Sequence, residues 1–296
     1  MLPHLSDDLY LTDGGIETVL IFEEGLDLPL FAAFTLLGDE AGTEALRRYY
    51  APYLALAAAH GLGFVAETPT WRASPRWARE LGYSDAELSA LNRRAVELMR
   101  ELGAGHERVV VSGCVGPSDD GYRPSALLSA DEAEAYHAVQ VAALADADRI
   151  TAITMTYAEE AIGVSRAAAR VGLPCVISFT VETDGRLPSG QSLPEAIAQV
   201  DAAAPPAFYM INCAHPTHFE SVLTGDWVSR VRGVRANASM LSHAELDEAT
   251  ELDAGDPADL GARYARLPLT LDVVGGCCGT DHRHVAAIAA ALVSRV

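Results

Sequence analysis

The chain has 296 residues, with 41 acidic and 21 basic side chains, which gives a net charge of −20 at neutral pH. Half of its residues are apolar, so it has enough apolar material for a large core, and a disordered chain is excluded. The negative charge, without any basic stripe, argues against a nucleic-acid partner. No apolar run reaches the ~18–20 residues of a membrane span. The first ten residues carry acids and no arginine, unlike a signal peptide, so a cytoplasmic protein without a membrane partner is expected.

All 21 basic residues are arginines, and the chain contains no lysine. This excludes Schiff-base chemistry on a lysine and the lysine-containing phosphate loop of nucleotide-binding proteins. The glycine-rich G-x-G-x-x-G signature of dinucleotide-binding proteins is missing as well. The chemistry must therefore be carried by Cys, His, Asp or Glu, or by a metal.

Eight short apolar or β-branched runs alternate with stretches of helical pattern. The expected strands are residues 8–13, 63–68, 108–114, 150–156, 174–181, 207–213, 231–237 and 269–275. The expected helices are residues 40–60, 84–104, 130–148, 158–171, 192–203, 216–224, 257–266 and 281–295. Ser84 with Glu87 and Ser129 with Glu132 have the spacing of a capping box at the helix start. The acidic stretch 244–259 is interpreted as a solvated loop and helix.

Eight such units predict an α/β fold, a (β/α)8 TIM barrel that spans residues 1–296 as a single domain. The strands are continuously apolar, as strands buried on both faces require. A doubly wound open sheet is the alternative. In a barrel, functional side chains lie at the C-terminal ends of the strands and in the loops that follow them.

Three of the five cysteines fall at such strand ends. Cys213 closes the strand 207–213, and Cys277 and Cys278 follow the strand 269–275. Three thiolates that converge on one point are typical of a zinc site, and a fourth position left open is typical of a catalytic one. The alternative, a buried small apolar side chain, is favoured for Cys114 and Cys175. A disulfide framework is not expected from an odd number of cysteines in this setting.

A zinc ion with three thiolate ligands is a poor Lewis acid, because the sulfurs donate much charge to it. It is better suited to binding a substrate thiol and lowering its pKa than to activating water. The sequence therefore favours alkyl transfer to a thiol. His215, His218, His282 and His284 are interpreted as residues at helix starts or on the rim, because three sulfurs and a substrate already complete a tetrahedron.

The motifs match a known family from end to end. They are Thr12-Asp13-Gly14-Gly15, Thr68-x-Thr70-x-x-Ala73-Ser74, Gly113-x-x-Gly116-Pro117, Ser178-Phe179-Thr180 with Asp184-Gly185-Arg186, Asn212-Cys213, Asn237, and Gly275-Gly276-Cys277-Cys278-Gly279-Thr280. With these the chain resembles the homocysteine S-methyltransferase family, whose members are zinc-dependent barrel enzymes. The resemblance implies that Cys213, Cys277 and Cys278 bind Zn²⁺. It also implies that Asp13 holds the amino group of homocysteine and the backbone at Gly14 its carboxylate, and it places Thr68 and Asn237 among the substrate-binding residues.

Two departures from the family pattern concern the amino group of the acceptor. The family has Glu-Thr after the fourth strand, where this chain has Met155-Thr156, so one carboxylate is missing. The family commonly has Thr-Asn-Thr after the second strand, where this chain has Thr68-Pro69-Thr70 preceded by Glu67. Glu67 is therefore a candidate replacement for the missing charge. Homocysteine is the expected acceptor, and a different thiol is the alternative.

The length of the chain resembles that of the compact family members, which use S-methylmethionine or S-adenosylmethionine. Aromatic faces attract such sulfonium cations, so Trp71 and Tyr122 are candidates for the donor site, with ordinary loop packing as the alternative. The expectation is a methyltransferase of methionine biosynthesis whose partners are a small thiol and a methyl donor. A non-catalytic zinc-binding barrel is the rival interpretation. The sequence indicates no oligomeric state.

Overall fold

Eight parallel strands close into a barrel in the order of the sequence, with β1 paired to both β2 and β8. The computed structural model describes residues 2–6, 8–249 and 251–294. The strands are β1 (Tyr10–Leu11), β2 (Gly63–Glu67), β3 (Val109–Val115), β4 (Arg149–Met155), β5 (Cys175–Phe179), β6 (Phe208–Asn212), β7 (Val231–Ala236) and β8 (Val273–Gly276). All eight expected strands are present, which confirms the TIM barrel over the open sheet.

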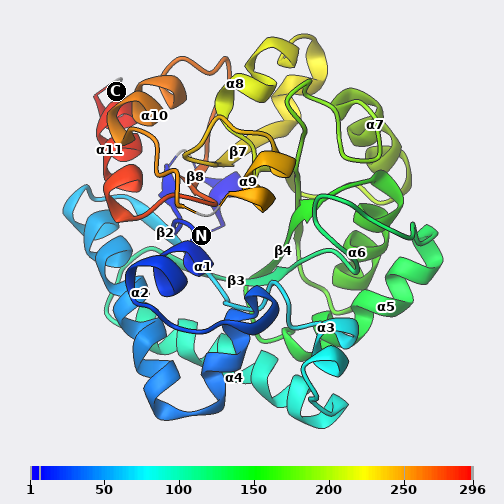
Figure 1. The fold of residues 1–296 in the computed structure, drawn as a ribbon. Coiled ribbons are helices and arrows are strands. Elements are labelled where there is room, and N and C mark those ends of the chain that lie inside the picture. Colours follow the sequence, from blue (N-terminus) through cyan, green and yellow to red (C-terminus); the bar gives the residue numbers. More distant parts are fainter. Residues whose placement is uncertain (1, 7, 250, 295–296) are drawn as a thin grey trace.

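Helices surround the barrel, and two short ones lie inside this ring (Figure 1). The outer helices are α2 (Glu40–Ala59), α3 (Pro75–Glu80), α4 (Asp85–Gly103), α5 (Ala130–Ala143), α6 (Ala158–Arg170), α7 (Leu193–Ala203), α8 (Pro216–Phe219), α10 (Pro257–Tyr264) and α11 (His282–Val293). The inner ones are α1 (Ile16–Thr18) and α9 (His243–Glu248). No helix of the described ranges is long and apolar enough to cross a membrane.

The expected helices differ from the observed ones mainly at their ends, and α1 and α3 are additional helices that the sequence did not predict. Both predicted capping boxes are formed, at Ser84 and at Ser129. The helix expected over 130–148 ends at Ala143, where Leu144 leaves helical geometry. The helix expected over 216–224 is instead the four-residue α8 followed by a 3-10 turn over Glu220–Val222. The last helix ends at Val293, and residue 295 of the expected range lies outside the described residues.

The first strand has only two residues, yet its hydrogen bonds to β8 continue for two residues more. The amide of Thr12 donates to the carbonyl of Val274, and the carbonyl of Asp13 accepts from the amide of Gly276. Asp13 is thereby fixed at the C-terminal end of the barrel, beside the loop that follows β8.

The barrel interior is closed towards its N-terminal end. An apolar cluster fills that end, with Tyr10, Val65, Val110, Val176, Phe208, Met210 and Val273. A buried ion pair lies in the interior as well, with 3.3 Å between Arg149 Nη2 and Glu67 Oε1. Space for chemistry is thus left to the C-terminal ends of the strands and the loops beyond them.

Candidate functional site

Strand β7 sets the spacing between the first two cysteines. The amide of Cys213, directly after β6, donates to the carbonyl of Arg235, at 3.1 Å. The amide of Cys277, directly after β8, donates to the next carbonyl of the same strand, that of Ala236, at 2.9 Å. The two cysteines are therefore held on either side of one strand, with 5.5 Å between their Cα atoms.

The sulfurs of Cys213, Cys277 and Cys278 all lie within 4.8 Å of one another. Cys213 is buried, while Cys277 and Cys278 are partly exposed. Within the described ranges, Cys114 and Cys175 do not belong to this or any other such group. The structure thus brings together the three cysteines that the sequence singles out, and leaves the other two buried in their strands.

The same cluster also holds a disulfide, between Cys213 and Cys277, which the sequence does not lead us to expect. Two sulfurs placed to share one ion are also close enough to react with each other. The disulfide and a three-thiolate site are alternative states of the cluster, because zinc binds thiolates and not disulfide sulfurs. Metal binding through all three residues requires the reduced form.

The loop that carries Cys277 and Cys278 is tightly folded. Thr280 donates its hydroxyl hydrogen to the carbonyl of Cys277, at 2.7 Å, and a Cβ at Gly276 would collide with that hydroxyl. The carbonyl of Cys278 accepts from the amide of Ala238, at 3.0 Å. The glycine is required by this close approach, which explains the Gly-Gly-Cys-Cys-Gly-Thr motif in physical terms.

Cys213 has a left-handed backbone, with φ of 52°, which is costly for a residue other than glycine. The preceding Asn212 stabilises this region. Its side chain accepts from the amide of Thr154 and donates to the Thr154 hydroxyl, both at 2.9 Å. Thr154 is itself left-handed, with φ of 65°, and its hydroxyl lies 3.8 Å from the Cys213 sulfur. The Asn-Cys motif therefore joins the ends of β4 and β6 beside Cys213.

Asp13 lies at the same end of the barrel in a dense set of contacts. Its carboxylate forms an ion pair with Arg235, at 2.8 Å, and accepts hydrogen bonds from Tyr49 at 2.9 Å and Thr12 at 2.7 Å. Arg235 also donates to the carbonyl of Gly14, at 3.1 Å. Burial acts to lower the pKa of Arg235, but Asp13 and Glu67 outweigh it and raise that pKa above its usual value.

The other predicted substrate-binding residues differ in whether their polar groups have a partner. Glu67 is buried and paired with Arg149, and burial raises the pKa of its carboxyl group. The Thr68 hydroxyl accepts from the amide of Cys114, at 2.9 Å. Trp71 Nε1 and Asn237 Oδ1 are buried and have no hydrogen-bond partner among the described residues. Their roles in substrate binding stay predictions.

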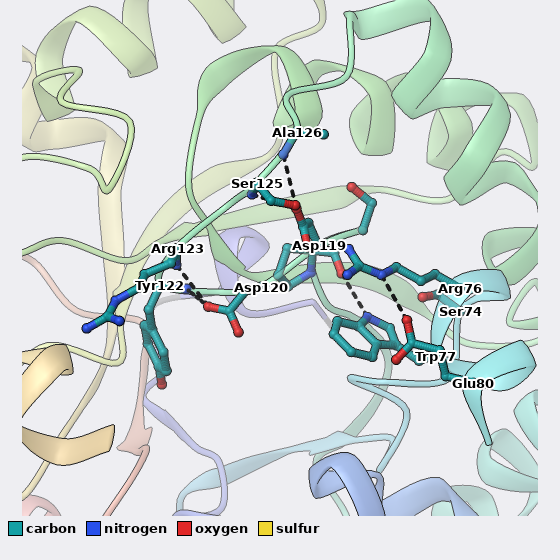
Figure 2. Close-up of polar contacts among 12 residues, drawn as sticks. Ser74, Arg76, Trp77, Glu80, Asp119, Asp120, Tyr122, Arg123, Ser125 and Ala126 are labelled. Carbon is teal, nitrogen blue, oxygen red and sulfur yellow. Dashed lines mark hydrogen bonds and ion pairs between the residues drawn. The ribbon is translucent and has the colours of Figure 1, made fainter. Parts of the chain in front are cut away.

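The loop after β3 reaches over the cysteines. Figure 2 shows Asp119 of this loop, which accepts from the amides of Ser125 and Ala126 and forms an ion pair with Arg76. Farther along the loop, the Tyr122 hydroxyl lies 3.6 Å from the Cys278 sulfur. Burial raises the pKa of the Cys278 thiol, and this hydrogen bond acts against that rise.

The tip of this loop meets the loop after β7. The rings of Tyr122 and His243, the first residue of α9, are 4.1 Å apart. His243 in turn donates from Nε2 to the carbonyl of Cys213, at 2.6 Å. Two loops from opposite parts of the chain thus meet beside the cluster and contact two of its cysteines.

A model of the homocysteine S-methyltransferase family matches residues 10–292. The chain belongs to the homocysteine S-methyltransferase family. It is a methyltransferase, and the rival interpretation of a non-catalytic barrel is thereby set aside. The three cysteines, at positions 213, 277 and 278, all lie within the residues that the family model matches.

Solved structures of the homocysteine methyltransferase MmuM from Escherichia coli have the same fold as the present chain. Its metallated form is 23% identical, with a TM-score of 0.73 and coverage of 96% of both chains. Its oxidised form is 24% identical, with a TM-score of 0.75 and coverage of 98% of this chain and 99% of that one. No curated protein sequence matches the chain closely enough to count as a relative.

The sequence did not single out several residues of this site. His243 contacts Cys213, Arg235 contacts Asp13, and the charges of Asp13 and Arg72 act on Glu17. None of His243, Arg235, Arg72 and Glu17 stands at a specified position of the motifs quoted above. Arg235 has one signal, because an arginine inside an apolar strand must find a buried partner. The histidines did behave as expected: His215 caps α8, and His284 completes the cap of α11.

Proposed function

We propose that this protein transfers a methyl group from a sulfonium donor to the thiol of homocysteine, with zinc held by Cys213, Cys277 and Cys278. The convergence of the three sulfurs at the C-terminal end of the barrel is the observation that carries this proposal. Family membership supports the acceptor. The description of the Escherichia coli structure as metallated supports the metal.

The donor set fits zinc in chemistry, and the spacing of one pair of its sulfurs fits in size. Zinc–sulfur bonds of about 2.3 Å in a tetrahedron place ligand sulfurs about 3.8 Å apart. The sulfurs of Cys213 and Cys278 are 4.0 Å apart. When bound, such an ion lowers the pKa of an acceptor thiol and leaves its sulfur electron-rich. The three residues come from two strand ends, and three protein ligands on a tetrahedral ion would leave its fourth position for the substrate.

The residues around the cluster divide the remaining tasks. The backbone at Gly14, next to the Asp13–Arg235 pair, is proposed to form part of the site for the acceptor carboxylate. The rings of Tyr122 and Trp71 are proposed to face the sulfonium donor, because aromatic faces stabilise a cation whose charge disappears during the reaction. The loops that carry Tyr122 and His243 exclude water from the reacting atoms.

The proposed reaction balances without any oxidant. The acceptor sulfur attacks the methyl carbon, the bond from that carbon to the donor sulfur breaks, and its electron pair stays on the donor. The donor becomes a neutral thioether, homocysteine becomes methionine, and the thiol proton is released. S-methylmethionine and S-adenosylmethionine are the proposed donors. We extend the proposal to a role in methionine biosynthesis in the cytoplasm, with residues 1–296 acting as one homocysteine-binding barrel domain.

The test is a methyl-transfer assay on reduced, zinc-loaded protein with each donor. Methionine formation from homocysteine that stops on chelation and returns with zinc supports the proposal. Parallel assays with other small thiols test the alternative acceptor. A reduced, zinc-loaded protein that methylates no thiol with either sulfonium would refute it.

A further inference from the structure

The carboxylates expected to hold an acceptor amino group are already engaged. Asp13 is paired with Arg235, and Glu67 is paired with Arg149. Met155, where the family has a glutamate, is fully buried and carries no charge. An ammonium group that leaves water needs a carboxylate partner, since an unpaired buried charge is costly. Binding of homocysteine therefore calls for another acid at this end of the barrel.

Glu17 lies where such an acid is needed. It belongs to α1, and two residues at the ends of this helix, Gly15 before it and Thr18 at its last position, touch the loop of Cys277 and Cys278. The amide of Gly15 donates to the carbonyl of Thr280, at 3.0 Å, and a Cβ on Gly15 would come within 2.5 Å of the Cys277 carbonyl oxygen. On the other side, the Thr18 hydroxyl accepts from the amide of Gly279, at 3.0 Å. Glu17 is thereby held beside this loop.

No arginine or histidine of the described ranges forms an ion pair with Glu17, in contrast to Asp13 and Glu67. Burial raises the pKa of Glu17 to about 7, and the negative charge of Asp13 adds to this effect. The more distant charges of Arg72 and Arg235 act in the opposite direction. A cation bound directly to this carboxylate would offset the free-energy cost of removing the carboxylate from water.

Arg72 is the matching unpaired cation. Its side chain is stacked between two tryptophans, with the guanidinium carbon 4.2 Å from the ring of Trp71 and 3.7 Å from that of Trp77. The residue is 8% exposed, and its Nε has no hydrogen-bond partner in the described part of the chain. One Nη donates weakly to the carbonyl of Asp119, at 3.5 Å. Within the described ranges it forms no ion pair with a carboxylate, although the charges of Asp120 and Glu17 act on its pKa.

We propose that Glu17 and Arg72 bind the two charged groups of the acceptor, its α-ammonium and its α-carboxylate respectively. The two side chains have opposite charge and form no ion pair with each other or with any other side chain of the described ranges, so both charges are available to a ligand. Both are specificity-determining residues that act on the acceptor, not on the transferred methyl group. The acceptor class is then an α-amino-acid thiol. This inference rests on the proposed function for the identity of the reaction.

Binding of the methylated products tests the inference without depending on turnover. The probes are L-methionine, 4-(methylsulfanyl)butanoate, which lacks only the amino group, and 3-(methylsulfanyl)propylamine, which lacks only the carboxylate. Their Kd values are measured by calorimetry on reduced protein. The variants are Glu17→Gln and Arg72→Met, with Arg72→Lys as the conservative change. Glu23→Gln and Arg79→Met are matched controls, because both lie nearby on the exposed surface.

Each variant is expected to lose affinity only for the probes that carry the charged group its side chain binds. Glu17→Gln raises the Kd of methionine about tenfold or more and changes that of the butanoate less than about threefold. Arg72→Met raises the Kd of methionine by a similar factor and leaves the Kd of the propylamine nearly unchanged. Arg72→Lys restores part of the affinity for methionine. Equal weakening of all three probes in either variant, unchanged methionine binding, or no binding of methionine by the wild type would overturn the inference. If this probe-selective loss of affinity is found in a protein that transfers no methyl group, the inference stands and the proposed function is refuted instead.

Discussion

Arg235 and Asp13 form a buried ion pair at the C-terminal end of the barrel, with 2.8 Å between Nη2 and Oδ1. Arg235 also donates to the carbonyls of Gly276, at 3.0 Å, and Gly14, at 3.1 Å. One side chain on β7 therefore connects the ends of β1 and β8. It fixes the loop of Cys277 and Cys278 relative to the loop that begins at Asp13, and it neutralises the acid that the family resemblance assigns to the substrate.

Arg235→Met is expected to lower the free energy of unfolding by ~3–5 kcal/mol, because it leaves the Asp13 charge buried and unpaired. The double variant Asp13→Asn/Arg235→Met is expected to lose less than the sum of the two single changes, since the pair is then removed as a unit. Urea unfolding of the wild type and the three variants measures both. Strictly additive losses of unfolding free energy would show that the two side chains do not stabilise each other.

Asn212→Ala is expected to weaken zinc binding about 10–100-fold, the usual effect of losing a residue that orients a metal ligand. Asn212 connects Thr154 and Ser178 next to the left-handed Cys213. Ser178→Ala is the matched control, because it removes only the hydroxyl that donates to Asn212. Competition with a chelator of known affinity gives the zinc Kd. Equal affinities in Asn212→Ala and the wild type would contradict this role.

Tyr122 has two groups that can contribute to donor binding, its ring and its hydroxyl, and two substitutions separate their effects. Tyr122→Phe keeps the ring, so the KM for a sulfonium donor is expected to change little. Tyr122→Ala removes the ring and is expected to raise that KM about twofold to thirtyfold, which corresponds to ~0.5–2 kcal/mol of cation–π attraction. Steady-state kinetics at saturating homocysteine measures both. A similar rise in the two variants would assign the effect to the hydroxyl near Cys278.

Asp119 is expected to make stability depend on pH. Burial acts to raise its pKa, but hydrogen bonds from Ser125 and the Arg76 charge outweigh it and hold that pKa well below its usual value. The ionised group therefore stabilises the folded state above its unfolded pKa of ~3.9, and this contribution is lost as the pH falls through the lower folded pKa. The difference in unfolding free energy between wild type and Asp119→Asn should be constant at neutral pH and shrink below about pH 5.

Denaturant unfolding at a series of pH values tests this, with the exposed Asp146→Asn as a control for the loss of one charge. A wild-type advantage over Asp119→Asn that persists unchanged to about pH 3 would contradict the assignment. Because Asp119 anchors the loop of Tyr122, the Asp119→Asn variant should also lose donor affinity in the same assays used for Tyr122.

The sequence predicted what depends on local pattern. Apolar runs predicted the eight strands, and the positions of Cys213, Cys277 and Cys278 at two strand ends predicted that they meet. It did not predict the Arg235–Asp13 pair or the contact of Tyr122 with His243, because these join residues far apart in the chain. Such contacts depend on strand register and on loop conformations such as the left-handed Thr154, which local composition does not specify.

The central claim is that three cysteine thiolates hold one zinc and accept the substrate thiol as a fourth ligand. A metal assay of the reduced protein should find about one zinc per chain, lost in Cys278→Ala and retained in the matched control Cys175→Ala. Retained zinc in a Cys213→Ala/Cys277→Ala double variant would already contradict the ligand assignment.

Zinc X-ray absorption of the reduced, zinc-loaded protein, recorded before and after addition of homocysteine, is the most direct test. Three sulfur neighbours at about 2.3 Å from zinc are expected in the free protein, and four are expected when homocysteine binds. A sulfur count that stays unchanged on addition of homocysteine, at concentrations that support methyl transfer, would contradict the central claim.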